Sequence, residues 1–291
     1  MRWPAWIANR TSRVRLWLVT RTFYSRPLPR EQRHMLNASQ AKVRGLSLEA
    51  YQNAHVLIVG AGGLGSNVAR ALACRGAGRL TILDDDRVEV QNLTRQCYSK
   101  KDIGKNKAIC NAKRTAQEAP FPLRIDARAK RFQEVADDNK FLSATLLWLI
   151  LVDNDPTRTA AQRKALALER PCIFAGVSRD ALSLYCAVYE PGQACLACMF
   201  PQIVANEGSY PCNVAGSIDI ALAASSLVVF ATDSILCGRR RGWNLRTLFL
   251  DGSMPQRCET VARNPDCALC SSIARNAASP DGQSRIDGVE S

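Results

Sequence analysis

Continuous apolar runs alternate with amphipathic segments along most of the chain. The apolar runs begin at His55 (HVLIVG), Arg79 (RLTILDD), Thr145 (TLLWLILVDND) and Cys172 (CIFAGV). Runs of this length, without polar alternation, are typical of strands buried on both faces of a parallel sheet. Apolar positions at helical spacing predict three intervening helices, near 66–74, 108–118 and 158–169. The alternation predicts an α/β fold, with a mostly parallel sheet and crossover helices.

The pattern changes in the second half of the chain. Three segments predict strands of a mixed or antiparallel region that extends the sheet: LSLYCAVYEPG from Leu182, RTLFLDG from Arg246 and CETVAR from Cys258. Another strand is predicted from Pro122, and residues 31–53 predict one or two helices. The long apolar segment from Ile218 carries Asp219 and Asp233, so it predicts a buried helix rather than a membrane span.

The composition indicates one large folded domain preceded by a basic N-terminal segment. A chain of 291 residues that is 47% hydrophobic can bury a full core as one large domain. The formal charge is +13, and the first 50 residues hold nine Arg and one Lys against two Glu, so the body is only mildly basic. No basic motif is interleaved with aromatic residues, and we expect neither nucleic acid nor a membrane as partner.

The same features suggest where the domain begins and ends. We expect residues 1–23 to form a disordered basic arm, residues 24–271 the folded domain and residues 272–291 a disordered tail. The arginine-rich start also resembles an organellar transit peptide. We favour an over-called start codon or a solvated basic arm over a transit peptide, and so expect a cytoplasmic protein, with organellar import as the open alternative.

The first apolar run leads into the glycine motif GAGGLG, which predicts a nucleotide site. Its glycines are Gly60, Gly62, Gly63 and Gly65, and Asp84 follows 19 residues after the last of them. Glycines at this spacing let the backbone approach phosphate at a helix N-terminus, which Ser66 is expected to cap, and an acid ending the second strand can accept from ribose hydroxyls. This Rossmann-like pattern leaves NAD, FAD and ATP open, and a glycine turn used only for packing is the alternative.

The loop after the second strand favours ATP. It reads DDDRVEVQNLTRQ from Asp84, with Lys107 following in DIGKNKA. Arg95 and Lys107 can neutralise charge on phosphates as pyrophosphate leaves, a need that a dehydrogenase lacks. Asn92 can contact the nucleotide or fix the loop, and the alternative is a solvated surface loop.

Two C-x-x-C pairs predict a metal site. Twelve cysteines in a chain of this length do not suggest a secreted disulfide framework, so we expect a reducing compartment. Two pairs, 68 residues apart, can complete a closed tetrahedron around structural Zn²⁺. The four predicted ligands are Cys195, Cys198, Cys267 and Cys270. Buried free thiols or redox pairs are the alternatives.

Taken in order, the motifs resemble those of the ThiF/MoeB/HesA family of adenylyltransferases, relatives of ubiquitin-activating enzymes. The motifs are YSR, GAGGLGS, DDDRVEVQNLTRQ, DIGKNKA, VDNDPTR, CLACMFP and DCALC, and they span about residues 24–271. The resemblance implies a homodimer that binds Mg-ATP and adenylates the C-terminal glycine of a small ubiquitin-like or sulfur-carrier protein.

The resemblance also implies roles for individual residues. Asp84 matches a ribose-binding acid, and three other positions match ATP-site residues: Asn92, Arg95 and Lys107. Asp153 matches an acid implicated in Mg²⁺ binding, with Asp155 as a less favoured ligand and a helix N-cap as the alternative role of Asp153. Arg26 matches an arginine that reaches the ATP of the neighbouring subunit.

Cys212 matches a loop cysteine that forms a covalent link with the carrier protein in some family members. A thiolate there would attack the acyl-adenylate to give a thioester, and an ordinary loop thiol is the alternative. Val152 stands where the family has threonine, which leaves the subfamily open. Two rival functions remain, an NAD-dependent oxidoreductase on the same sheet and a degenerate zinc-stapled scaffold or pseudoenzyme subunit.

Overall fold

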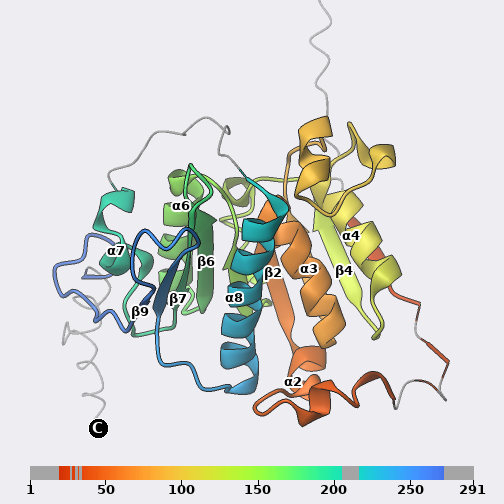
Figure 1. The fold of residues 1–291 in the computed structure, drawn as a ribbon, viewed down its shortest axis with the longest axis horizontal. Coiled ribbons are helices and arrows are strands. Elements are labelled where there is room, and N and C mark those ends of the chain that lie inside the picture. The colour runs from red at the N-terminus through yellow and green to blue at the C-terminus, as the bar shows by residue number, and fades with distance from the viewer. Residues whose placement is uncertain (1–19, 27, 30–31, 33–34, 205–215, 272–291) are drawn as a thin grey trace, which may run out of the picture.

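The computed structural model describes residues 20–26, 28–29, 32, 35–204 and 216–271. Within them lies one nine-stranded sheet of order β1-β4-β3-β2-β5-β6-β7-β8-β9 (Figure 1). Its strands are β1 Thr20–Tyr24, β2 His55–Val59, β3 Arg79–Leu83, β4 Arg124–Arg128, β5 Leu147–Ile150, β6 Cys172–Val177, β7 Ser183–Tyr189, β8 Leu245–Phe249 and β9 Arg257–Glu259. The five central strands, β4, β3, β2, β5 and β6, are parallel to one another. Strand β1 pairs antiparallel at one edge, and β7, β8 and β9 pair antiparallel at the other.

Helices cover both faces of this sheet. The α-helices are α2 Leu48–Asn53, α3 Gly63–Arg75, α4 Lys107–Glu118, α5 Asn139–Ser143, α6 Asp155–Ala167, α7 Leu196–Met199 and α8 Ile218–Cys237. Short 3-10 helices lie at η1 Gln40–Lys42, η2 Val90–Thr94, η3 Lys100–Asp102, η4 Phe132–Glu134 and η5 Pro201–Val204. Helices α3, α4 and α8 pack on one face, and α5, α6 and α7 on the other.

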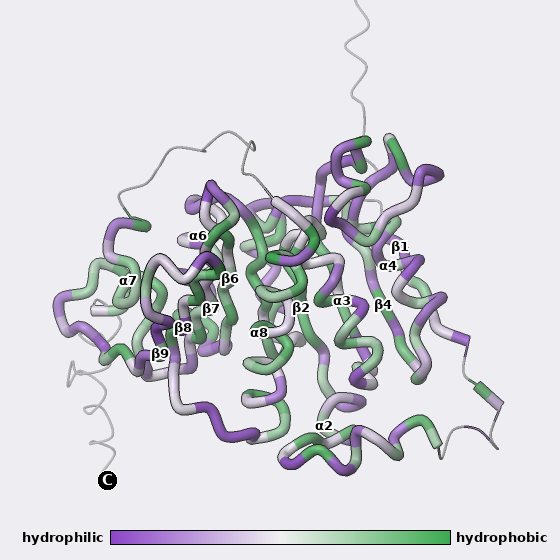
Figure 2. The backbone as a smooth tube through the Cα atoms, viewed as in Figure 1, coloured by the Kyte–Doolittle hydropathy of each residue, from purple (hydrophilic) through white to green (hydrophobic). Residues whose placement is uncertain are grey.

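The strand β2 shows how the sequence divides the core between these layers. Val56 and Ile58 belong to the cluster under α3, α4 and α8, whereas Leu57 and Val59 belong to the cluster on the opposite face. All four side chains are buried, because alternate residues of a central strand point to opposite faces. Figure 2 shows the resulting apolar strands between more polar outer segments.

The predicted α/β class, the crossover helices and the antiparallel extension are confirmed, and three local predictions are wrong. Residues 20–23 are not part of a disordered arm, because they pair with β4 in β1. Ser66 does not cap α3: the helix begins at Gly63 with Gly62 as N-cap, and the Ser66 hydroxyl accepts from Cys97 N–H instead. Helix α6 begins at Asp155 rather than near residue 158.

Helix α8 is a core helix that carries a buried acid. It is long and apolar enough to cross a membrane, but half of its most apolar window is buried in the protein. The side chain of Asp233 is fully buried and accepts from Tyr51 Oη at 2.6 Å, from Arg239 at 3.0 Å and from Arg75 at 3.3 Å. These contacts satisfy the carboxylate and tie α8 to α2 and α3.

Replacing this acid should therefore destabilise the fold. We expect Asp233→Ala to lower the free energy of unfolding by about 2–4 kcal/mol, because the Tyr51 hydroxyl and the guanidinium groups lose a buried partner. Urea denaturation measures the loss. The matched control is Asp219→Ala, in the exposed first turn of the same helix, which should cost less than about 1 kcal/mol. Equal losses would contradict a structural role for the buried carboxylate.

Candidate functional site

The glycine turn lies at the point in the sheet where the strand order reverses. Strands β3 and β4 follow on one side of β2, and β5 and β6 on the other. The crevice at such a switch point, outside the carboxyl ends of the strands, is where open α/β sheets bind ligands. Gly60 follows β2 directly, and the free N–H groups of the first turn of α3 come next.

Two of the four predicted glycines are required by close backbone contacts. Gly60 has φ +94°, and a Cβ placed there would lie 2.6 Å from the carbonyl oxygen of Leu151. A Cβ on Gly65 would lie 1.9 Å from the carbonyl oxygen of Gly60. The turn therefore needs hydrogen at both positions to bring α3 against β2 and the end of β5. A Cβ on Gly62 or Gly63 would make only ordinary van der Waals contacts, none closer than 3.7 Å.

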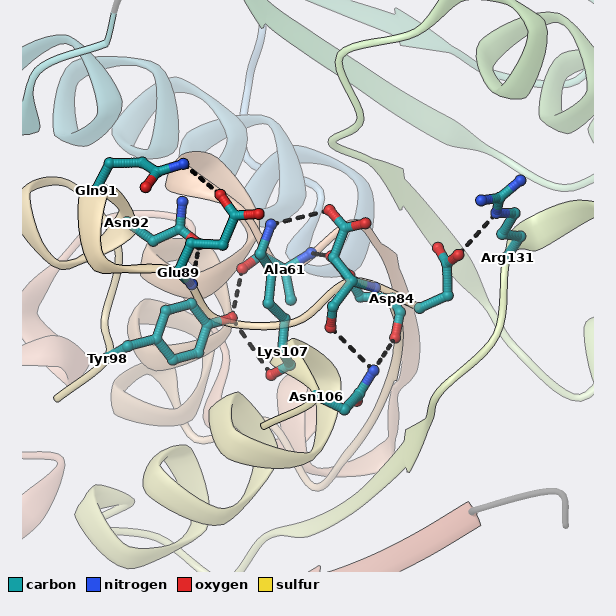
Figure 3. A network of polar contacts seen from close by, with 11 residues as sticks. Ala61, Asp84, Glu89, Gln91, Asn92, Tyr98, Asn106, Lys107 and Arg131 are labelled. Carbon is teal, nitrogen blue, oxygen red and sulfur yellow. Dashed lines mark hydrogen bonds and ion pairs between the residues drawn. The ribbon is translucent and has the colours of Figure 1, made fainter. Parts of the chain in front are cut away.

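Asp84 is the acid of this site. Its Oδ2 accepts from Ala61 N–H at 2.6 Å, within the glycine turn, and its Oδ1 accepts from Asp86 N–H at 2.8 Å (Figure 3). Burial raises the pKa of Asp84 to about 6, because removing the carboxylate from water outweighs these hydrogen bonds and the charge of Lys107. The group can therefore change its charge just below neutral pH.

The long loop between β3 and α4 is fastened to this turn. Tyr98 is buried and donates its hydroxyl to Ala61 O at 2.6 Å. Asn106 caps α4 and donates to the carbonyl oxygens of Asp84 and Asp86, at 2.9 and 3.1 Å. Asn92 is buried, and its Oδ1 accepts from Glu89 N–H at 2.9 Å (Figure 3). Of the two roles predicted for Asn92, fixing the loop is the one seen here.

Both predicted phosphate-binding cations lie against the protein. Lys107 opens α4, its side chain is only 12% exposed, and its Nζ contacts Asp86 Oδ2 at 2.9 Å. Arg95 donates from Nη1 to Gln91 O at 3.3 Å, and a Cβ on Gly216 would lie 2.9 Å from Arg95 Cδ. Arg95 therefore packs beside the start of α8, next to the first turn of α3.

Asp153 follows β5 at the same edge of the sheet. It is exposed, and Asn154, not Asp153, caps α6 by accepting from Thr157 N–H, so the N-cap role weighed for Asp153 is wrong. Arg158 shapes this loop by donating to Val152 O at 2.6 Å and to Asp155 at 2.8 Å. The side chain of Asp155 is thereby engaged within α6.

One predicted residue, Arg26, is not brought to this edge within a single chain. Arg26 is exposed and lines a separate hollow of about 560 Å³ between β1 and α4, together with Phe23, Tyr24 and Lys113. Within one chain it therefore lies apart from the glycine turn. Cys212 lies outside the described residues.

The four predicted metal ligands converge at the far side of the sheet, near α7. Neighbouring sulfur atoms lie 3.4 Å (Cys195 to Cys267), 3.6 Å (Cys198 to Cys270) and 3.8 Å (Cys195 to Cys198) apart, and all four lie within 4.8 Å of one another. A tetrahedral ion with four bonds of about 2.3 Å needs an edge of about 3.8 Å. The cluster can therefore hold a metal ion of the zinc type.

Several residues that shape the site were not predicted from the sequence. Asn106 could have been found, since an asparagine before a helical pattern is an N-cap signal. Tyr98, Arg158 and Asp86 carry no such signal, because their partners come from other elements.

Comparisons with known proteins place the chain in one family. A family model described as the ThiF family matches residues 32–269. The chain is 30% identical over 231 residues to the sulfur carrier protein adenylyltransferase of Thermus thermophilus, covering 76% of this chain and 84% of that protein. It is 27% identical over 234 residues to the adenylyltransferase and sulfurtransferase MOCS3 of Sus scrofa, covering 75% of this chain and 48% of that protein.

A solved structure shows a similar fold. E. coli MccB with succinimide matches with a TM-score of 0.64 and 21% identity, over 77% of this chain and 68% of that chain. At this identity the likeness bears on the arrangement of helices and strands alone.

Proposed function

The chain belongs to the ThiF family and is an ATP-dependent adenylyltransferase, and from this premise we propose that it activates the C-terminal carboxylate of a small ubiquitin-like or sulfur-carrier protein. The observation that carries the proposal is the convergence of the glycine turn, Asp84 and Lys107 at one edge of the sheet. The motif order had indicated the same family, and the family match confirms it.

These positions support the following reaction. The carboxylate of the carrier attacks the α-phosphorus of ATP, the bond to the bridging oxygen breaks, and pyrophosphate leaves with the electron pair. Asp84 accepts from the ribose hydroxyls, while the N–H groups opening α3 hold phosphate oxygens. Lys107 and Arg95 offset the charge that develops on the leaving group. No general base is needed, because a carboxylate is already ionised at pH 7.

Three further parts of the proposal complete the site. Asp153, exposed at the carboxyl end of β5, would hold Mg²⁺, which supplies charge neutralisation at the phosphates. Arg26 lies away from the glycine turn of its own chain, which supports a homodimer in which it reaches the partner's nucleotide. Cys212 would take the acyl group from the adenylate as a thioester, with release of AMP.

The rival functions explain less of the molecule. An NAD-dependent oxidoreductase accounts for the glycine turn and Asp84, but it gives no role to Lys107 or to the four-cysteine cluster. A degenerate scaffold gives no reason for the Lys107 side chain to lie beside the turn with only 12% of its surface exposed.

The activity is tested by ATP–pyrophosphate exchange. We expect exchange only when a sulfur-carrier protein ending in glycine is added, and none when its terminal glycine is deleted. Lys107→Ala should lower the exchange rate on the order of 10²-fold, because the leaving pyrophosphate loses a charged partner. Tight NADH binding without exchange would instead support the oxidoreductase.

The pKa of Asp84 predicts how ATP binding depends on pH. The ionised carboxylate accepts from ribose, so affinity should fall as pH drops through about 6, and roughly tenfold weaker binding is expected at pH 5 than at pH 7.5. Calorimetric titration of Mg-ATP across this range measures the change. Asp84→Asn should bind weakly at every pH, and its pH dependence then reports the titration of ATP itself. A pH dependence as steep in this variant would contradict the assignment.

We also propose that the four-cysteine cluster holds structural Zn²⁺. Elemental analysis of the purified chain should find about one zinc per chain, and chelation should lower the melting temperature. Cys267→Ser should lose the metal, because a closed tetrahedron needs all four sulfurs. Cys258→Ser is the matched control, since Cys258 is exposed on β9 and stands outside the cluster. Zinc retained at full occupancy in Cys267→Ser would refute the site.

A further inference from the structure

Asp86 contacts Lys107 through both its backbone and its side chain. The carbonyl oxygen of Asp86 accepts from Lys107 N–H at 2.8 Å, and Oδ2 accepts from Nζ at 2.9 Å. Asn106, the N-cap of α4, donates to the same carbonyl oxygen at 3.1 Å (Figure 3). The end of β3 and the start of α4 are therefore fixed to each other around this one residue.

Lys107 stands at an unfavourable place for a cation. It is the first residue of α4, where unpaired N–H groups and the helix dipole concentrate positive charge. A lysine there is expected to extend into water, yet this side chain is only 12% exposed. In the described part of the chain, Asp86 is the one carboxylate within 4.0 Å of its Nζ. The carboxylate therefore offsets the repulsion and keeps the ammonium beside the glycine turn.

This contact leaves the ammonium able to bind a second anion. An ammonium group has three N–H donors, and the contact with Asp86 uses one of them. Asp86 is itself 63% exposed, so it faces the solvent side of the site while Lys107 lies inward. We propose that Asp86 is a positioning residue, which holds the ammonium of Lys107 where the phosphates of ATP bind. The inference rests on the proposed function and adds to it a residue that acts through Lys107.

The adjacent acid provides a matched comparison. Asp85 contacts Arg131 at 2.7 Å, and the arginine side chain is 71% exposed. This pair lies on the surface and does not involve Lys107 (Figure 3). Removing either carboxylate changes the net charge by the same amount, so a comparison of the two separates the contact from the charge.

The test is a double-mutant cycle on Mg-ATP binding by the full chain, measured by calorimetry. Asp86→Asn should weaken binding on the order of tenfold, whereas Asp85→Asn should match the wild type. Asp86→Asn combined with Lys107→Ala should bind as weakly as Lys107→Ala alone, because Asp86 then has nothing to position. Asp86→Glu, which keeps the charge, should recover part of the affinity and serves if the asparagine variant fails to fold.

Several outcomes would overturn the inference. Unchanged or tighter Mg-ATP binding in Asp86→Asn would do so, as would an Asp85→Asn variant that loses as much affinity. Losses that multiply in the double variant would show that Asp86 acts independently of Lys107. A wild-type chain that binds no Mg-ATP would remove the proposed function together with the inference, whereas normal wild-type binding with an unaffected Asp86→Asn removes the inference alone.

Discussion

The rest of the structure depends on one constraint, the close backbone-to-backbone contacts that glycine permits at the turn after β2. Gly60 lies against the carbonyl of Leu151, and Gly65 lies against the carbonyl of Gly60, at separations that exclude any Cβ. Strand β2, the end of β5 and helix α3 therefore meet within one turn of chain. Because β2 and β5 flank the switch point of the sheet, this contact places the helix N-terminus over the crevice where a phosphate can bind.

A polar loop holds the charged side chains around that turn. Tyr98 and Asn106 connect the glycine turn, the end of β3 and the start of α4 through backbone carbonyl oxygens. The backbone contacts fix where the loop runs, and so place the side chains of Asp84 and Lys107 beside the glycine turn. The raised pKa of Asp84 reflects the same arrangement, since the loss of hydration on burial outweighs the hydrogen bonds from the backbone N–H groups of Ala61 and Asp86.

Much of this could be predicted from the sequence, and the misses have physical causes. The central strands and the glycine motif carry local signals, because apolar runs and tight turns restrict composition strongly. Strand β1 was missed because its TRTFY segment is exposed at nearly every position, as expected for an edge strand that gains its order from pairing with β4. The role assigned to Ser66 was wrong because α3 begins at Gly63, with Gly62 as an N-cap that has no side chain, so Ser66 already lies within the helix.

The site residues also divide into those with a local sequence signal and those whose role depends on tertiary contacts. Asp84 could be predicted because it ends the strand that follows the glycine motif, and Lys107 because a cation after the following loop suits the phosphates of ATP. Asp86 could not be distinguished from Asp85, since three consecutive aspartates look alike until tertiary contacts give each a different partner. Tyr98 and Arg158 act on backbone carbonyl oxygens of other elements, and sequence spacing carries no information about such partners.

The four-cysteine cluster and the nucleotide site lie apart, yet packed side chains connect them. Phe200 follows the Cys195–Cys198 pair by two residues, and its ring packs on Tyr185 of β7 at 4.9 Å. The ring of Tyr185 lies below the guanidinium of Arg158 at 5.9 Å, and Arg158 in turn holds the carbonyl of Val152, next to Asp153. Gly176 makes room for this stack, because a Cβ there would lie 2.6 Å from the tyrosine ring. A metal ion that fixes the cysteines would therefore also fix the support of the loop that carries Asp153, which gives the cluster a mechanical connection to the site without any contact with the nucleotide.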